Sequence, residues 1–311
     1  MKLRRMLAIF LMLVLFLGST LSAAESVSSI VKNQTEANNS NSESTQPEDV
    51  QYYALIVGVE RFSDPKVNDS VFEDDKIDDE AIAIHELLLT SENWKDENIK
   101  IILNENATKD KIQDAIVNWL GEKEDENDIV LIYYADHGWK IPLKQRRYGH
   151  AAVFTYNVTS ENRLEDKITD KEFDSWVDTL DSKNIAIILD TCSSGRMLSL
   201  RQQGRTILTA GGKYFFCGVD EDDTLGTGIF GHFLIQGFKG VADLNNDGWV
   251  SAEEVFRYAR LPTIHFSIWK QFPFIIQAHN RTMIWFFQIP RMYDRHFGDI
   301  KLVQYQSATK E

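Results

Sequence analysis

Runs of apolar residues alternate with amphipathic stretches along residues 51–260 of the chain. The apolar runs are short and rich in Ile, Val, Leu and Tyr, which is typical of buried strands. The predicted strands are 52–59, 99–103, 129–134, 151–156, 185–189, 206–210 and 214–219. Apolar residues recur at helical spacing over 74–89, 108–120, 169–180, 228–238 and 252–260. This alternation predicts an α/β fold, a three-layer sandwich with a mostly parallel central sheet and helices on both faces.

The two ends of the chain do not show this alternation. Residues 1–24 combine basic residues near the start, an apolar stretch over 6–18 and small residues before position 24. They predict a signal peptide cleaved after Ala24, so the protein is expected to be secreted or extracytoplasmic. An uncleaved N-terminal membrane anchor is the alternative. Residues 25–50 are polar and predict a disordered linker or pro-segment, and residues 261–311 form an aromatic-rich, irregular extension of unknown role.

Acidic residues outnumber basic residues, and the formal net charge is −14. This balance argues against a nucleic-acid partner and favours cationic substrates, although an acidic surface also serves solubility alone. The chain has two cysteines, Cys192 and Cys217. Because a domain of this size needs no covalent link and Cys217 lies in an apolar run, we expect two free thiols, with a disulfide as the alternative.

A histidine and a cysteine each follow a predicted buried strand. His137 comes shortly after strand 129–134, and Cys192 comes shortly after strand 185–189. The carboxyl ends of parallel strands are where open α/β sheets place their chemistry. A neutral imidazole can take the proton of a thiol, and the thiolate is a nucleophile. Either residue alone is more often structural, but the pair predicts a cysteine hydrolase in which the backbone N–H groups of Gly138 and Cys192 form an oxyanion hole.

Three segments around these residues resemble the caspase–metacaspase–legumain clan of cysteine peptidases. They are Tyr-Ala-Leu-Ile-Val-Gly-Val at 53–59, Tyr-Tyr-Ala-Asp-His-Gly at 133–138 and Asp-Thr-Cys-Ser-Ser-Gly at 190–195. The third is most similar to metacaspases and prokaryotic caspase-like enzymes, and Asp-His-Gly to legumains. His137 precedes Cys192 by 55 residues, near the spacing of roughly 50 in caspases. No Gln-Ala-Cys-Arg-Gly occurs, which argues against the animal caspases and their aspartate preference.

The resemblance implies a caspase-like fold over residues 51–260 and an endopeptidase that hydrolyses proteins or peptides through a thioester acyl-enzyme. It implies that Asp190 lines the pocket for the substrate side chain preceding the cleaved bond (P1) and pairs with Arg or Lys there. A second pocket carboxylate is expected at Asp79 or Asp78, in the acidic cluster at the start of the first helix, which consists of Glu73, Asp74, Asp75, Asp78, Asp79 and Glu80. A solvated helix start is the alternative for that cluster. The role of Asp136, next to the histidine, is left open.

Two other classes of function remain possible at this point. A legumain-like asparaginyl endopeptidase or transpeptidase would share the Asp-His-Gly segment. A non-catalytic, calcium-stabilised binding module would share the fold. Arg196, Arg201 and Arg205 follow the nucleophile, which makes self-cleavage there a hypothesis beside ordinary surface charge.

Residues 243–254 match the twelve-residue calcium-binding loop of EF-hands. The predicted ligands are Asp243, Asn245, Asp247, the Trp249 carbonyl, Ser251 and Glu254. Gly248 provides the sharp turn. An Asn/Asp-rich turn without a metal is the alternative. A single loop of this kind predicts a structural Ca²⁺ rather than a sensor, and no organic cofactor is expected.

Overall fold

The computed structural model describes residues 50–68, 77–136, 151–159, 161, 166–192, 194–211, 225, 227–277 and 288–305, with the side chains of 270–277 left aside. The predictions for residues 1–49 and for His137, Gly138 and Cys217 lie outside the described residues. None of the helices in the described part has the length and apolar character needed to cross a membrane.

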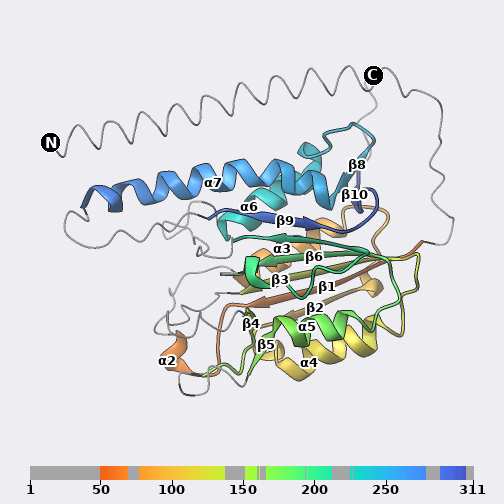
Figure 1. Ribbon diagram of the computed structural model, residues 1–311, viewed down its shortest axis with the longest axis horizontal. Helices are drawn as coiled ribbons and strands as arrows, with labels where there is room; N and C mark the ends of the chain where they lie inside the picture. Colours follow the sequence, from red (N-terminus) through yellow and green to blue (C-terminus); the bar gives the residue numbers. More distant parts are fainter. Residues whose placement is uncertain are drawn as a thin grey trace. The chain divides into compact units, whose positions relative to one another are not determined.

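The core of the fold is a six-stranded sheet with the order β2-β1-β3-β6-β7-β9 (Figure 1). The first five strands of this order pair in parallel, and β9 pairs antiparallel with β7 at the edge. Because both faces of the sheet are covered, β1, β3 and β7 are buried along their whole length. The strands are β1 (Tyr52–Val59), β2 (Ile99–Leu103), β3 (Ile129–Asp136), β6 (Asn184–Asp190), β7 (Arg205–Thr209) and β9 (Arg291–Asp294). The predicted mostly parallel α/β sheet is confirmed.

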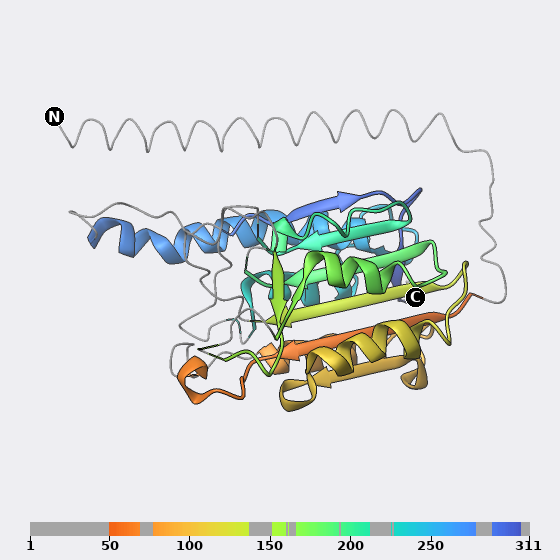
Figure 2. The same cartoon turned by 60° about the horizontal axis from the view of Figure 1, so that its bottom comes forward.

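Helices cover both faces of this sheet, because successive residues of a strand point to opposite sides. On one face, α3 (Ile77–Leu88), α6 (Ile229–Gln236) and α7 (Ala252–Gln277) pack on alternate strand residues. On the other face, α4 (Lys109–Asp114) and α5 (Asp170–Val177) pack on the intervening residues. The two views of the ribbon agree on this three-layer arrangement (Figures 1 and 2).

Two helices begin at the threonines that the sequence pattern favours. The Thr169 side chain accepts the Glu172 N–H at 3.2 Å, and the Glu172 carboxylate accepts the Thr169 N–H at 2.9 Å. This reciprocal capping satisfies two N–H groups that have no partner within the helix. Thr108 caps α4 in the same way through the Lys111 N–H at 3.4 Å, and the chain continues from α4 into a π-helical turn, η3 (Ala115–Leu120).

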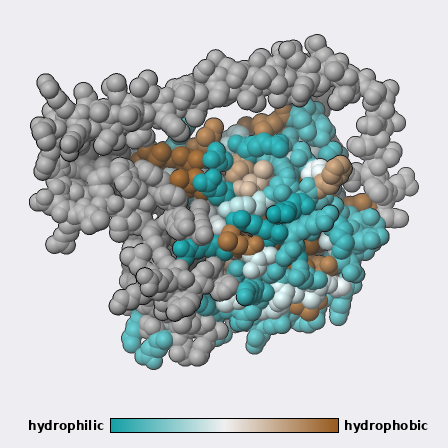
Figure 3. Space-filling model, in the orientation of Figure 1, coloured by the Kyte–Doolittle hydropathy of each residue, from teal (hydrophilic) through white to brown (hydrophobic). Residues whose placement is uncertain are grey.

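The C-terminal part of the chain is more regular than its sequence pattern predicts. Helix α7 runs on to Gln277, β9 extends the main sheet, and β10 (Lys301–Gln304) pairs antiparallel with β8 (Trp249–Ser251). Shorter elements complete the described fold: α2 (Pro65–Asn68), η1 (Asp96–Asn98), η2 (Asn104–Asn106), β4 (Ala152–Phe154), β5 (Lys167–Thr169), η5 (Ser194–Arg196) and η6 (Gly237–Val241). On the face seen in Figure 3, the described residues are largely hydrophilic, with some apolar spots between them.

The strand β7 argues against self-cleavage at Arg205. Arg205 begins β7, its side chain is buried, and its backbone lies between the strands β6 and β9. Its guanidinium contacts Asp174 at 2.8 Å and Asp178 at 2.7 Å. A peptide bond within a sheet is not available to a protease cleft, so the hypothesis is wrong at this position. Arg201 stacks on the Tyr293 ring, with its guanidinium carbon 3.2 Å from the ring centroid.

We expect the substitution Arg205→Met to lower the free energy of unfolding by about 2 kcal/mol, because it leaves a largely buried carboxylate at Asp174 without its cation. Urea denaturation measures this. Lys109→Met is a matched control: the Lys109–Glu172 ion pair is partly exposed, and its loss is expected to change stability by less than about 1 kcal/mol. Equal effects of the two substitutions would contradict the structural role given to Arg205.

Candidate active site

The ends of β3 and β6, which precede the predicted dyad in the sequence, lie side by side in the sheet. These strands are parallel neighbours, and Ala135 of β3 pairs with Asp190 of β6. His137 and Cys192 each come two residues after this registered pair in the sequence. Cys192 is half-buried and carries a thiol rather than a disulfide. The register therefore places Ala135 and Asp190, each two residues before a member of the predicted dyad, side by side, while His137 itself lies outside the described residues.

The turn after Cys192 is fixed by the segment that follows β7. The Gly195 N–H donates to the Gly211 carbonyl at 2.9 Å. The Gly211 N–H donates to the Ser194 hydroxyl at 3.2 Å. The 3₁₀ turn η5 (Ser194–Arg196) follows at once. These two hydrogen bonds hold the backbone that follows Cys192 against Gly211.

Asp136, the last residue of β3, has a structural partner. Its buried carboxylate accepts the Phe154 N–H at 2.6 Å, which ties the end of β3 to β4. The negative charge of Asp136 also raises the pKa of Asp190, as a smaller contribution beside burial. Asp136 thus shapes the electrostatics of this edge of the sheet.

Asp190 lies against a carboxyl group that the sequence interpretation missed. Glu80, on α3, and Asp190 are both buried, and their carboxyl groups lie close enough to interact electrostatically. The Tyr133 hydroxyl donates to Glu80 Oε1 at 2.6 Å. The Gly228 N–H donates to Glu80 Oε2 at 2.8 Å, and the Gly231 N–H donates to Asp190 Oδ2 at 2.7 Å. Four elements, α3, β3, β6 and α6, therefore meet at one pair of acids.

The residues predicted for the second carboxylate lie elsewhere. Asp79 is exposed to solvent, and Asp78 accepts a hydrogen bond from the Asn104 amide at 2.9 Å. The buried stripe of α3 runs through Ile77, Ala81 and Ile84, and position 80 falls on it by helical periodicity. The apolar spacing was therefore a signal that could have selected Glu80.

Burial favours the neutral, protonated forms of Glu80 and Asp190. Loss of solvation is the largest cause for each, and it raises the pKa of Glu80 well above its ordinary value and the pKa of Asp190 to about 7. The charge of Asp190 raises the pKa of Glu80 further. The hydrogen bond from the Gly228 N–H lowers the pKa of Glu80, and the hydrogen bond from the Gly231 N–H lowers the pKa of Asp190. The same burial raises the pKa of Tyr133 well above 10.

Two glycines on the loop and first turn of α6 allow this close approach. A Cβ atom on Gly231 would lie 2.2 Å from the Glu80 carboxyl carbon. A Cβ atom on Gly228 would lie 2.9 Å from Glu80 Oε2 and 3.1 Å from Asp190 Oδ2. Only a residue without a side chain lets the backbone N–H groups reach both acids.

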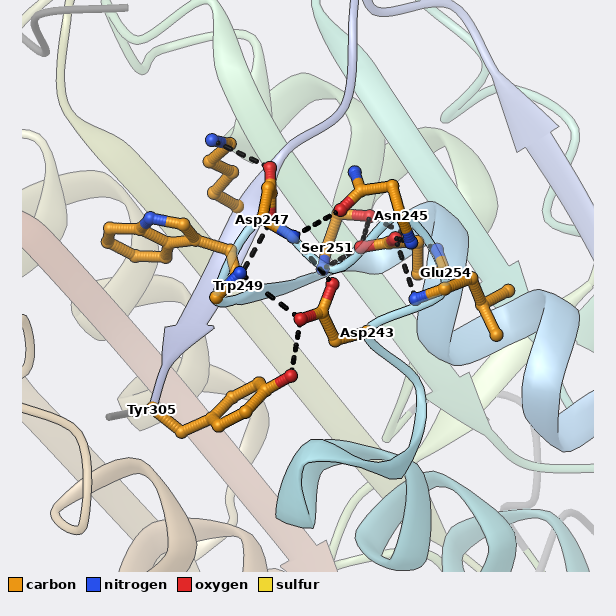
Figure 4. Close-up of polar contacts among 10 residues, drawn as sticks. Asp243, Asn245, Asp247, Trp249, Ser251, Glu254 and Tyr305 are labelled. Atoms are coloured by element: carbon orange, nitrogen blue, oxygen red, sulfur yellow. Dashed lines mark hydrogen bonds and ion pairs between the residues drawn. The ribbon is translucent and has the colours of Figure 1, made fainter. Parts of the chain in front are cut away.

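The six predicted calcium ligands lie in one loop that closes on itself between η6 and α7 (Figure 4). Gly248 has φ +82°, the left-handed backbone expected for its sharp turn. Asp243 accepts the N–H groups of Asp247 and Gly248, each at 3.1 Å. Glu254 accepts the N–H groups of Leu244 and Asn245 through Oε1 and that of Ser251 through Oε2.

The hydrogen bonds within the loop decide how its oxygen atoms are placed for a metal ion. The side chains are oxygen donors of the kind that Ca²⁺ prefers. Their carboxylates are turned to the N–H groups of the loop, however, and Asp247 also contacts Lys301 at 2.9 Å. Among the described residues, no three His, Cys, Asp or Glu side chains gather closely enough to hold a metal ion. The loop is therefore ordered by its own hydrogen bonds in this structure.

Comparison with known proteins shows a likeness to one family. Residues 53–201 match the family model described as the metacaspase, peptidase C14 domain. This stretch is similar to metacaspase peptidase domains. It contains β1, β3, β6 and Cys192, so the caspase-like resemblance of the sequence motifs is confirmed.

A solved structure extends the likeness in fold beyond this stretch. Protein GSU0716 from Geobacter sulfurreducens superposes with a TM-score of 0.53 over 82% of this chain and 97% of that one, at 12% sequence identity. At this identity the likeness concerns the fold alone. None of the curated protein sequences compared with the chain matches it.

Proposed function

We propose that this protein is a secreted cysteine endopeptidase that cleaves peptide bonds after Arg or Lys through Cys192 and His137. The observation that carries the proposal is the register of β3 with β6, in which the paired residues Ala135 and Asp190 each precede a member of the dyad by two residues. The metacaspase-like domain makes a cysteine peptidase the family expectation. Secretion follows from the signal-like residues 1–24.

The proposed reaction is an acyl transfer in two steps. The imidazole of His137 takes the thiol proton of Cys192, and the sulfur attacks the carbonyl carbon of the peptide bond. The backbone N–H groups of Gly138 and Cys192 stabilise the oxyanion. The C–N bond then breaks as the imidazolium gives its proton to the leaving amine, which leaves a thioester. Water, deprotonated by the imidazole, hydrolyses that thioester and restores the thiol.

The preference for a cationic side chain is supported by the acids beside the nucleophile. Asp190 precedes Cys192 by two residues, and Glu80 adds a second carboxyl group to the same buried site. A guanidinium or ammonium group forms charge-assisted hydrogen bonds with such groups. The acidic character of the whole chain would also attract cationic substrates.

A panel of peptide substrates that differ only in the P1 residue tests the proposal. Arg, Lys, Asn, Asp and citrulline at P1 are compared by kcat/KM on the full chain. We expect turnover after Arg and Lys and little after the others. Turnover of the Asn peptide alone would replace the proposal by a legumain-like specificity, and no turnover with any peptide would favour a binding module.

We also propose that the loop 243–254 binds Ca²⁺ as a structural ion. The support is its complete set of oxygen donors at the EF-hand positions and the left-handed Gly248. Asp243, Asn245, Asp247, Ser251 and Glu254 would hold the ion with side-chain oxygens, and Trp249 with its carbonyl. The ion would link η6 to α7 and would take no part in the reaction.

We expect millimolar Ca²⁺ to raise the melting temperature by several degrees, because a ligand of the folded state alone stabilises it. Differential scanning fluorimetry with Ca²⁺, Mg²⁺ and EDTA measures this. Asp243→Asn should remove the shift. Lys301→Ala should increase it, because Lys301 contacts the Asp247 carboxylate. The same melting temperature in Ca²⁺ and EDTA would show that the loop needs no metal.

A further inference from the structure

We propose that Glu80 and Asp190 share a single proton in the free enzyme, and that a cationic P1 side chain takes the place of this proton when it binds. The inference rests on the proposed function, since it concerns how the same pocket receives its substrate. The pair then carries one negative charge in the free enzyme rather than two. Recognition of the substrate is then an exchange of one cation for another.

The first step of the argument is the contact between the two acids. Two ionised carboxylates repel each other and cannot form a hydrogen bond, since neither has a hydrogen to donate. Glu80 and Asp190 are both buried, and a Cβ atom on Gly228 would lie 2.9 Å from Glu80 Oε2 and 3.1 Å from Asp190 Oδ2, so the two carboxyl groups face the same short stretch of backbone. One proton between them resolves this conflict, as it does in other buried pairs of acids.

The second step concerns the groups that face the pair. Helix α6 contributes the N–H groups of Gly228 and Gly231, and β3 contributes the Tyr133 hydroxyl. The charged group from β3 is Asp136, which is negative. Among the residues that the structure describes, no Lys, Arg or His forms an ion pair with Glu80 or Asp190. These neighbours satisfy lone pairs but supply no positive charge for a second ionised acid.

The third step is the balance of charge on binding. The shared proton leaves one negative charge on the pair. A guanidinium or ammonium group that enters brings one positive charge, which stabilises the second ionised acid. The proton is then released to solvent, so the affinity for a cationic ligand rises about tenfold per pH unit wherever the free pair holds the proton. A neutral ligand of the same shape releases no proton.

Calorimetry on the full chain with Cys192→Ala tests the exchange. Peptides with Arg or citrulline at P1 are titrated in two buffers of equal pH and different ionisation enthalpy. We expect the Arg peptide to release about one proton per site, the citrulline peptide to release none, and Glu80→Gln to abolish the release. Binding of the Arg peptide without proton release would overturn the exchange and leave the proposed specificity standing.

Infrared spectroscopy of the same protein without ligand provides the second measurement. A shared proton contributes to the carbonyl band of protonated carboxyl groups at pH 7, and this contribution should be lost in Glu80→Gln, while that of Glu60, whose pKa burial raises to about 8, remains. An unchanged band in Glu80→Gln would overturn the inference whatever the peptides do. A band at pH 7 combined with binding of Asn peptides alone would instead overturn the proposed specificity. Lys109→Met, away from the pocket, controls for the substitution itself.

Discussion

Replacing Cys192 by alanine is expected to reduce kcat/KM for an Arg peptide by at least about a thousandfold. The sulfur of Cys192 forms the thioester, and it is the one nucleophile in the proposed reaction. Loss of the nucleophile from a catalytic pair removes nearly all of the effect of the pair, and only binding and the oxyanion hole remain. Continuous hydrolysis of a fluorogenic peptide measures the change.

Cys217→Ala is the matched control, because it removes the other thiol of the chain. It should retain most of the parent activity, and both variants should keep the melting temperature of the parent within a few degrees. Activity retained in Cys192→Ala but lost in Cys217→Ala would assign the nucleophile to the other cysteine. Loss in both, with an unchanged melting temperature, would contradict a single catalytic thiol.

Gly231→Ala is expected to lower the free energy of unfolding by about 3 kcal/mol, the upper end of the range for overpacking a buried site. The added Cβ atom would lie 2.2 Å from the Glu80 carboxyl carbon, so the helix α6 or the acid must move. Movement of either breaks the hydrogen bonds that the Gly228 and Gly231 N–H groups donate to the acids. Urea denaturation of the Cys192→Ala protein measures the change without self-digestion.

A double-mutant cycle separates this clash from a general effect of alanine on the helix. Glu80→Ala removes the atoms that the new Cβ would meet, so Gly231→Ala should destabilise that background much less than it destabilises the parent. Gly228→Ala is expected to have a smaller effect than Gly231→Ala, because its closest approach is 2.9 Å. Additive free energies in the cycle would contradict the contact on which the acid pair depends.

The sheet could be predicted from the sequence because its signal is local. β1 and β3 are unbroken runs of apolar residues, and a buried parallel strand needs nothing more. The capping threonines Thr108 and Thr169 also act within a few residues, so the starts of α4 and α5 were predictable.

The features that the sequence did not predict depend on contacts between distant segments. Glu80 reads as one more acid of a solvated cluster until α6 supplies the Gly228 N–H, which is 148 residues away. β9 is short and polar in part, and it becomes a strand because β7 offers it an unpaired edge. The helix α7 extends to Gln277 although Pro262 lies within it, a residue that favours the end of a helix in a local reading.

Labelling with an active-site-directed reagent tests the central claim most directly. The full chain is treated with a peptidyl acyloxymethyl ketone that carries Arg at P1, and the site of modification is located by mass spectrometry of proteolytic fragments. The account predicts one adduct, on Cys192, which is lost in His137→Ala and reduced by competition with an Arg peptide. An adduct on Cys217, or none on a protein that is folded by circular dichroism, would contradict it.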